Sequence, residues 1–395
     1  MSAVQHIMLQ FFWSIPQSIR VVPYKVEDGM SEVVLDMLPE IYRQWLPEVF
    51  WRPAIPERKA TCDSCAMCLP EGAQLSKEQA DRQGFFQPDL KCCTFQPSIP
   101  NYLIGGLLSD ERPLFAEGQR RVKDYIALRI GVHPQWVRPS NKQLLLLQAS
   151  QQSSFGRSSQ LLCPFFQTPQ NNCSIWKFRD SDCSFFFCKH EAGEDGRTLW
   201  KRMQTWMWTL ETKLSYHLAK SVCPSFSWAL EGKKKKVTRL AIHVLEERPM
   251  PDDEYSKIWG EWAGKEEAFY RACYDAACAL TKQDFDNIMQ EELDETLPQL
   301  AHLYNKVTSP TLPQFLIPHP ELTIQQMNDE LSLFVAYSRY DPVLLPKEVE
   351  DLIQAFSAEE TVQETLQRLY DEQEIEVEEA FLIGLHQLRI LIEPT

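Results

Sequence analysis

The fold is decided around residues 163–190, which read CPFFQTPQNNCSIWKFRDSDCSFFFCKH. This stretch places Cys163, Cys173, Cys183 and Cys188 among many aromatic side chains. Thiolates bind soft and borderline metals well, and an apolar shell protects an iron–sulfur cluster and shifts its potential. The stretch therefore predicts a metal-stabilised core domain, with ordinary core packing as the alternative for its aromatic residues.

A second group of cysteines lies upstream, in Cys62-x2-Cys65-x2-Cys68 and the adjacent pair Cys92-Cys93. With the spacing C-x2-C-x2-C, one loop can wrap three corners of a cubane cluster, whereas zinc sites more often use two C-x2-C pairs. Adjacent cysteines point in divergent directions. One of the pair could complete a four-thiolate set, and the other could serve a second centre or simply pack. The spacing favours a 4Fe–4S cluster, with zinc as the alternative.

Several residues in the downstream stretch carry a family resemblance. Cys163-Pro164-Phe165-Phe166, Asn172 to Trp176, Arg179 and Cys183 resemble the signature of the YkgJ-like cysteine-cluster family, whose members are described as zinc- or iron-chelating. Trp176 stands at the family's aromatic position, and Asp180 replaces a proline. The resemblance implies that the upstream cysteines correspond to the family's N-terminal cysteine loop. We expect Arg179 and Trp176 to lie beside the cofactor, where Arg179 would neutralise thiolate charge.

The flagellin lysine methylases are similar in size and cysteine content, so the resemblance also implies protein lysine N-methylation with S-adenosylmethionine. The sequence has no P-loop, dinucleotide fingerprint, HExxH or nucleophile elbow. Three functions therefore stay open. The chain could use a cysteine-ligated centre in redox or metal-dependent chemistry, modify a protein or peptide with the help of that centre, or form a zinc-stabilised scaffold for protein contacts.

Other chemically active residues have simpler interpretations. Cys223, Cys273 and Cys278 lie outside both groups and are predicted to pack in the core. His190 follows Cys188 by two residues. It could serve as a metal ligand, as a proton donor or as a surface residue. The next segment, 196–219, has apolar residues at helical spacing and predicts a core-packing helix. Its tryptophans could instead form an aromatic wall beside the metal.

Composition limits the class of protein. Hydrophobic residues make up 44%, charged residues 24%, and the net charge is −15. These values are typical of a soluble globular chain, and the acidic balance disfavours nucleic acid and anionic membranes. No targeting signal is apparent in the first residues, and no apolar run reaches the length that a spanning helix needs. We expect a cytoplasmic protein, in which tight C-x2-C spacing indicates metal rather than disulfides.

The chain divides by pattern into an N-terminal region (1–58), a cysteine-cluster domain (59–235), a helical region (236–307) and, after a proline-rich linker, an acidic module (321–395). Helices are also expected over 33–46 and from residue 120, and a strand over 237–245. The overall class is mainly α with irregular cysteine-rich loops (α+β).

The C-terminal module has the pattern of three short helices with flanking extended segments, which resembles small winged-helix peptide-recognition domains. It holds 17 acidic and 4 basic side chains. This balance argues against DNA and favours a protein or peptide partner.

Overall fold

The computed structural model describes residues 33–55, 57, 65, 67–68, 84–150, 154–168, 170–226 and 247–394. Cys62, the lysine run 233–236 and the strand expected over 237–245 lie outside the described residues.

The described part is mainly helical, with small antiparallel sheets, which confirms the expected class. The α-helices are α3 (Asn101–Ser109), α4 (Ala116–Leu128), α5 (Asn141–Ser150), α6 (Ser181–Ser184), α7 (Gly193–Val222), α9 (Asp252–Trp259), α10 (Glu266–Ala279), α11 (Lys282–Glu291), α12 (Leu297–Thr308), α13 (Glu348–Gln354), α14 (Val362–Gln373) and α15 (Glu379–Gln387). The strands are β1 (Ile99–Pro100), β2 (Trp136–Val137), β3 (Phe166–Gln167), β4 (Asn172–Cys173), β5 (Ile317–Pro318), β6 (Thr323–Gln326), β7 (Leu331–Val335), β8 (Val343–Pro346) and β9 (Leu391–Ile392). None of the described helices is long and apolar enough to cross a membrane.

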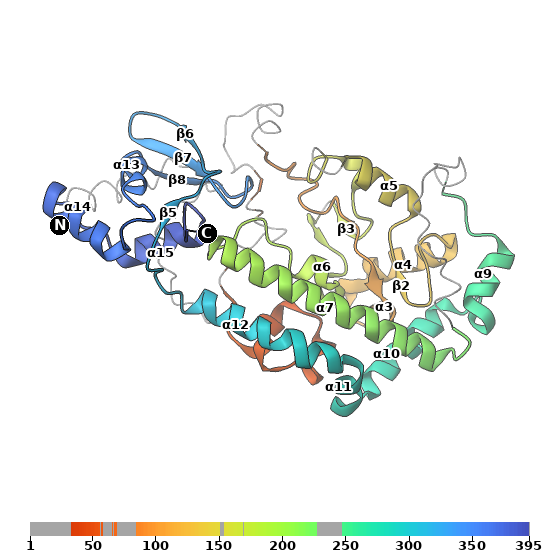
Figure 1. Cartoon of the computed structure of the whole chain (residues 1–395). Coiled ribbons are helices and arrows are strands. Elements are labelled where there is room, and N and C mark those ends of the chain that lie inside the picture. Colours follow the sequence, from red (N-terminus) through yellow and green to blue (C-terminus); the bar gives the residue numbers. More distant parts are fainter. Residues whose placement is uncertain are drawn as a thin grey trace.

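The long helix α7 runs through the middle of the molecule, and α12 lies along it (Figure 1). Its predicted apolar stripe is buried, as expected for a core-packing helix: Leu199, Met203, Trp206, Leu210 and Leu214. On the other side, α10 packs against both α3 and α7. The approach of α3 to α10 is very close, because a Cβ at Gly105 would lie 1.9 Å from the Tyr270 carbonyl oxygen. These contacts build the main core.

The helix predicted over residues 33–46 is wrong. The segment forms the short 3-10 turns Val34–Met37 and Glu40–Gln44, followed by a third, Glu48–Trp51. Pro39 and Pro47 stand at the start of the second and third turns. A proline lacks the amide hydrogen and disfavours helical geometry in the preceding residue, so it interrupts a continuous helix.

The C-terminal residues have a hydrophobic cluster of their own, which runs from Leu316 to Leu391. It lies between the sheet β6–β7–β8 and the helices α13 to α15 (Figure 1). We call residues 316–394 the C-terminal module. The module abuts the start of α7, where a Cβ at Gly193 would lie 2.2 Å from the Gln387 carbonyl oxygen. This contact brings the module close to the cysteine-rich loops.

Candidate metal centre

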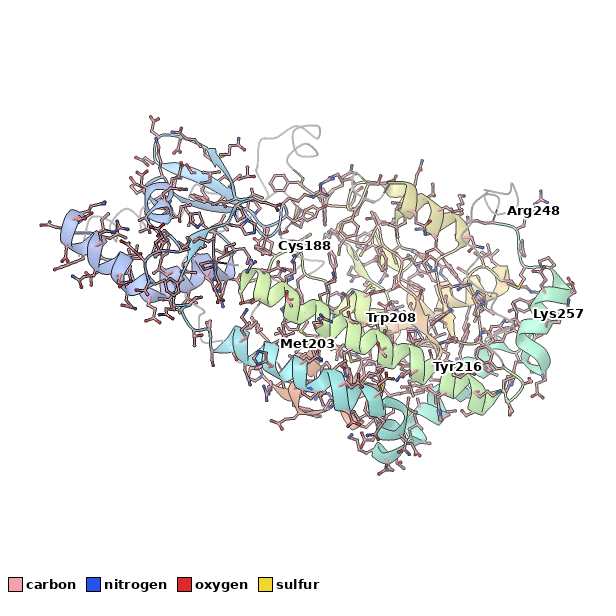
Figure 2. The ribbon with its side chains drawn as sticks, in the orientation of Figure 1. Cys188, Met203, Trp208, Tyr216, Arg248 and Lys257 are labelled. Carbon is pink, nitrogen blue, oxygen red and sulfur yellow. The ribbon has the colours of Figure 1, made fainter. Side chains whose placement is uncertain are left out.

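Four cysteines from three parts of the chain gather at the N-terminal end of α7. Cys65, Cys68, Cys92 and Cys188 share a hydrophobic cluster with Met67 and Phe86. We call these four residues thiol set 1. Cys188 lies between α6 and α7, on the side that faces the C-terminal module (Figure 2). The set therefore joins the upstream loop, the adjacent pair and the downstream stretch.

Short backbone contacts hold the upstream loop in place. The Cys68 amide donates to the Cys65 carbonyl at 3.0 Å, and the Phe86 amide donates to the Met67 carbonyl at 2.8 Å. Gly156 lies against the Phe86 ring with a positive φ of 76°, and a Cβ there would be 2.2 Å from that ring. Only glycine fits this turn. Phe86 thus anchors the loop that presents Cys65 and Cys68.

The electrostatics of thiol set 1 favour a thiolate at one position. A hydrogen bond from the Cys68 thiol lowers the pKa of Cys65 to about 6, against the effect of burial; the Met67 and Cys68 amides and the Lys91 ammonium lower it further. As the donor of that bond, Cys68 has a raised pKa, and burial raises it further. Burial, followed by the charge of Cys92, raises the pKa of Cys188. Cys65 thus ionises readily and can bind a cation as a thiolate, whereas Cys68 and Cys188 would lose their protons when a cation binds.

A second group of thiols lies in the main core. Cys163 follows a 3-10 turn (Ser159–Leu161), Cys173 ends β4, and Cys183 belongs to α6. Burial raises the pKa of Cys163, and the nearby Cys173 raises it further. Burial also raises the pKa of Cys183, with Asp180 and Cys163 adding to it. These three thiols are therefore neighbours, and those of Cys163 and Cys183 are shielded from water.

Cys93 lies beside this second group. The Cys163 amide donates to the Cys93 carbonyl at 2.7 Å, and the Cys93 side chain packs against the main core, as Cys173 does. We call Cys93, Cys163, Cys173 and Cys183 thiol set 2. The sequence grouping differs in two places, because Cys188 leaves its stretch for set 1 and Cys93 leaves its neighbour for set 2. Cys62 lies outside the described residues.

The helix α6 is tied to α7 by carboxyl groups. Glu211 accepts hydrogen bonds from the Ser181 amide at 2.9 Å and the Ser181 hydroxyl at 2.7 Å. Asp180 accepts from the Cys183 amide at 3.1 Å and so caps α6. Burial raises the pKa of Glu211, and Asp180 raises it further. Glu211 therefore positions the helix of Cys183, and its surroundings favour the protonated form more than water does.

Arg179 and Trp176 pair with each other. The Arg179 guanidinium lies 3.5 Å from the centre of the Trp176 ring, and its Nε donates to the Trp176 carbonyl at 3.1 Å. Trp176 is 37% exposed, so its ring lies at the surface. The Arg179 charge lowers the pKa of Cys183, against the larger effect of burial. Arg179 therefore lies near thiol set 2.

The aromatic residues that were expected beside the metal are buried only in part. Trp200 packs against Phe187, with ring centres 4.9 Å apart, and against Phe185 at 5.9 Å. Trp206 belongs to the main core, where it contacts Phe50, whereas Trp208 is 50% exposed. Of the three tryptophans, Trp200 therefore suits an aromatic wall beside the cysteine stretch.

The remaining cysteines divide between core and surface. Cys223 and Cys273 are buried, as expected, but Cys278 is exposed, so the core prediction for Cys278 is wrong. Cys278 follows the buried Ala277 near the end of α10 and lies on an exposed face of the helix.

Sequence reasoning missed four residues near thiol set 1. The ammonium groups of two buried lysines, Lys91 and Lys189, lie near the thiols. Tyr340 and Asp341 reach the set from the C-terminal module. A lysine next to a cysteine is too common in sequences to indicate a buried cation. The contribution of Tyr340 and Asp341 can be seen only in the tertiary structure, because they come from the C-terminal module.

The donor chemistry fits a soft metal, because thiolates are the usual ligands of iron–sulfur clusters and of structural zinc. Within the described ranges, however, no three cysteine, histidine, aspartate or glutamate side chains form a group that could hold a metal ion as they stand. Loading would therefore draw the thiols of a set together. Comparisons with protein-family profiles, curated proteins and solved structures find no match.

Proposed function

We propose that this chain binds metal through its cysteines, with an iron–sulfur cluster at thiol set 1. The observation that supports it most is the convergence of Cys65, Cys68, Cys92 and Cys188 from distant segments into one small cluster. Unrelated core cysteines have no reason to gather, whereas a metal site needs several thiols at one place. Cys62 adds a fifth candidate by its spacing, and a C-x2-C-x2-C loop suits a cubane.

Thiol set 2 is proposed as a second centre, with zinc as the alternative to a cluster. Its thiols come from separate short elements, an arrangement suited to a structural site that ties loops together. Burial raises the pKa of Cys163 and of Cys183, so binding would release protons and stabilise the folded chain. In either case the metal would supply cross-links between the loops that surround α7.

Anaerobic purification tests this function. We expect a brown protein that absorbs near 400 nm, with about four irons and an equal amount of sulfide for each cubane. Cys65→Ser and Cys188→Ser should both remove the iron of thiol set 1, whereas Cys278→Ser should leave the metal unchanged. A chain that is colourless and free of metal would overturn the proposal, and a zinc-loaded chain would overturn its iron–sulfur form.

A second proposed activity concerns the C-terminal module, which we propose to be a winged-helix-like unit that binds an extended basic peptide. Strand β6 lies at an edge of the β6–β7–β8 sheet and is largely exposed. An exposed edge offers unpaired backbone groups to an added strand. The module's excess of acidic side chains favours a lysine- or arginine-rich partner. A protein lysine methylase acting with S-adenosylmethionine would have a substrate of this kind.

A further inference from the structure

The loop between β7 and β8, residues 336–342, connects the C-terminal module to thiol set 1. Tyr340 packs against the cluster that contains Cys188. The neighbouring Asp341 is 2% exposed, and its Oδ2 accepts a hydrogen bond from the His190 amide at 3.2 Å. Tyr337 donates its hydroxyl to the same oxygen. The module therefore binds the backbone of His190, two residues after Cys188.

The second oxygen of Asp341 is unsatisfied. Its Oδ1 is buried and has no hydrogen-bond partner among the described residues. A buried carboxylate is costly unless donors or a cation compensate it. The charge of Asp341 reaches Cys188, since it is among the smaller causes, after burial and the neighbouring thiols, that raise the pKa of that thiol. Four thiolates outweigh the charge of a zinc ion or a cubane core, so a loaded centre is anionic, and Asp341 would act on it through the position of the Cys188 loop that Oδ2 holds.

We infer that Asp341 is a positioning residue of thiol set 1, through which metal binding and docking of the C-terminal module stabilise each other. The inference rests on the proposed metal function. Oδ2 holds the loop of Cys188 in place, and Tyr340 shields the thiols from water.

The coupling has to be reciprocal. If the docked module tightens metal binding by some factor, bound metal tightens docking of the loop by the same factor. Groups that orient metal ligands typically change metal affinity by about 10- to 100-fold when they are replaced. We therefore expect the 336–342 loop to open about tenfold more often when metal is removed.

Two measurements on the full chain test this inference, with zinc alone as the probe. In the first, the reduced metal-free chain is titrated with zinc against a chromophoric chelator. Asp341→Ala removes the acceptor of the His190 amide, and it should weaken one zinc site about tenfold. Asp329→Ala, an exposed change in the same module, is the matched control. In the second, hydrogen exchange of the His190 amide in the wild-type chain is followed with and without zinc.

The outcomes separate the two proposals. If the wild-type chain binds no metal, the proposed function fails and the coupling fails with it. If the wild-type chain binds zinc at a site that Cys188→Ser removes, while Asp341→Ala binds zinc as tightly and the exchange of the His190 amide does not change with zinc, the coupling alone is overturned. The exchange measurement needs no variant, so a poorly folded Asp341→Ala would still leave the inference open to refutation.

Discussion

The thiols of Cys92 and Cys93 are adjacent in the chain but pack into two different clusters. Cys92 lies with Cys188 in the small cluster at the end of α7, and Cys93 packs against the main core. Lys91 turns the chain just before them with a left-handed backbone (φ 52°). The pair is therefore the point where the two thiol sets meet, and its two members can be tested separately.

Replacing each member of the pair should remove a different metal. Cys92→Ser is expected to empty thiol set 1 and leave thiol set 2 loaded, and Cys93→Ser is expected to do the reverse. Metal and sulfide counts per chain give the measurement, with Cys278→Ser as the exposed control. Loss of the same metal from both variants would show that the pair serves one centre.

Glu211 should make stability fall as pH rises. Because burial and Asp180 raise its pKa well above the usual value, the folded chain keeps this proton after the unfolded chain has lost it, above about pH 4.3. Stability should then decrease by up to about 1.4 kcal/mol per pH unit until the folded pKa is reached. Glu211→Gln should remove this part of the slope.

Urea unfolding of the wild type and of Glu211→Gln between about pH 5 and 8 measures the difference, since the unfolding free energy is compared at each pH. Glu372→Gln, on the exposed face of α14, is the control and should follow the wild type. Parallel curves for wild type and Glu211→Gln would mean that Glu211 is ionised in the folded chain.

The contact of α3 with α10 predicts that two adjacent glycines differ in how well they tolerate a larger side chain. A Cβ at Gly105 would meet backbone atoms of Tyr270, which cannot move aside, whereas one at Gly106 would meet the Tyr274 and Phe178 rings at 3.0–3.1 Å. Gly105→Ala should therefore lower the unfolding free energy by about 3 kcal/mol or more, and Gly106→Ala by about 1 kcal/mol or less. Thermal and urea unfolding of the two variants would show this, and equal losses would contradict the close packing.

The fold could be predicted where local signals were strong. The stripe from Leu199 to Leu214 predicts α7, and the observed helix adds residues at both ends of the expected span. The segment 33–46 shows the limit, since its apolar spacing is helical but Pro39, and Pro47 directly after the segment, favour short 3-10 turns. Local spacing does not report which backbone hydrogen bonds tertiary packing will allow.

The candidate site could be predicted only in its residue types. Spacing marked out the cysteines, but their division into two sets depends on where the loops meet. Cys188 lies five residues from Cys183 in the chain, yet α6 ends between them and sends Cys188 toward Phe86. Asp341 contacts His190 across 151 positions, which no local pattern can indicate.

The start of α14 offers a test of a helix cap. Thr361 and Glu364 form a capping box, with the Glu364 amide donating to the Thr361 hydroxyl at 3.2 Å and the Thr361 amide donating to Glu364 at 2.8 Å. The similar spacing of Ser357 and Glu360 forms no such box, because Glu360 accepts from Arg368 instead. Thr361→Ala should destabilise the C-terminal module by about 1 kcal/mol, and Ser357→Ala by less. Hydrogen exchange within α14 measures both, and equal effects would argue against the cap.

The exposed edge of β6 predicts salt-sensitive binding of basic peptides. Asp329 and Glu330 lie exposed at the turn between β6 and β7, next to that edge. A fluorescent lysine-rich peptide should bind the full chain more weakly as salt is added, because exposed charge pairs are screened. Asp329→Lys and Glu330→Lys should each weaken binding about two- to fivefold, since an exposed pair contributes about 0.2–1 kcal/mol and the reversal adds repulsion. Glu372→Lys on α14 carries the same charge change away from β6 and should have little effect. If all three variants weaken binding equally, the peptide is attracted by the acidic module as a whole, and the strand edge is not its site.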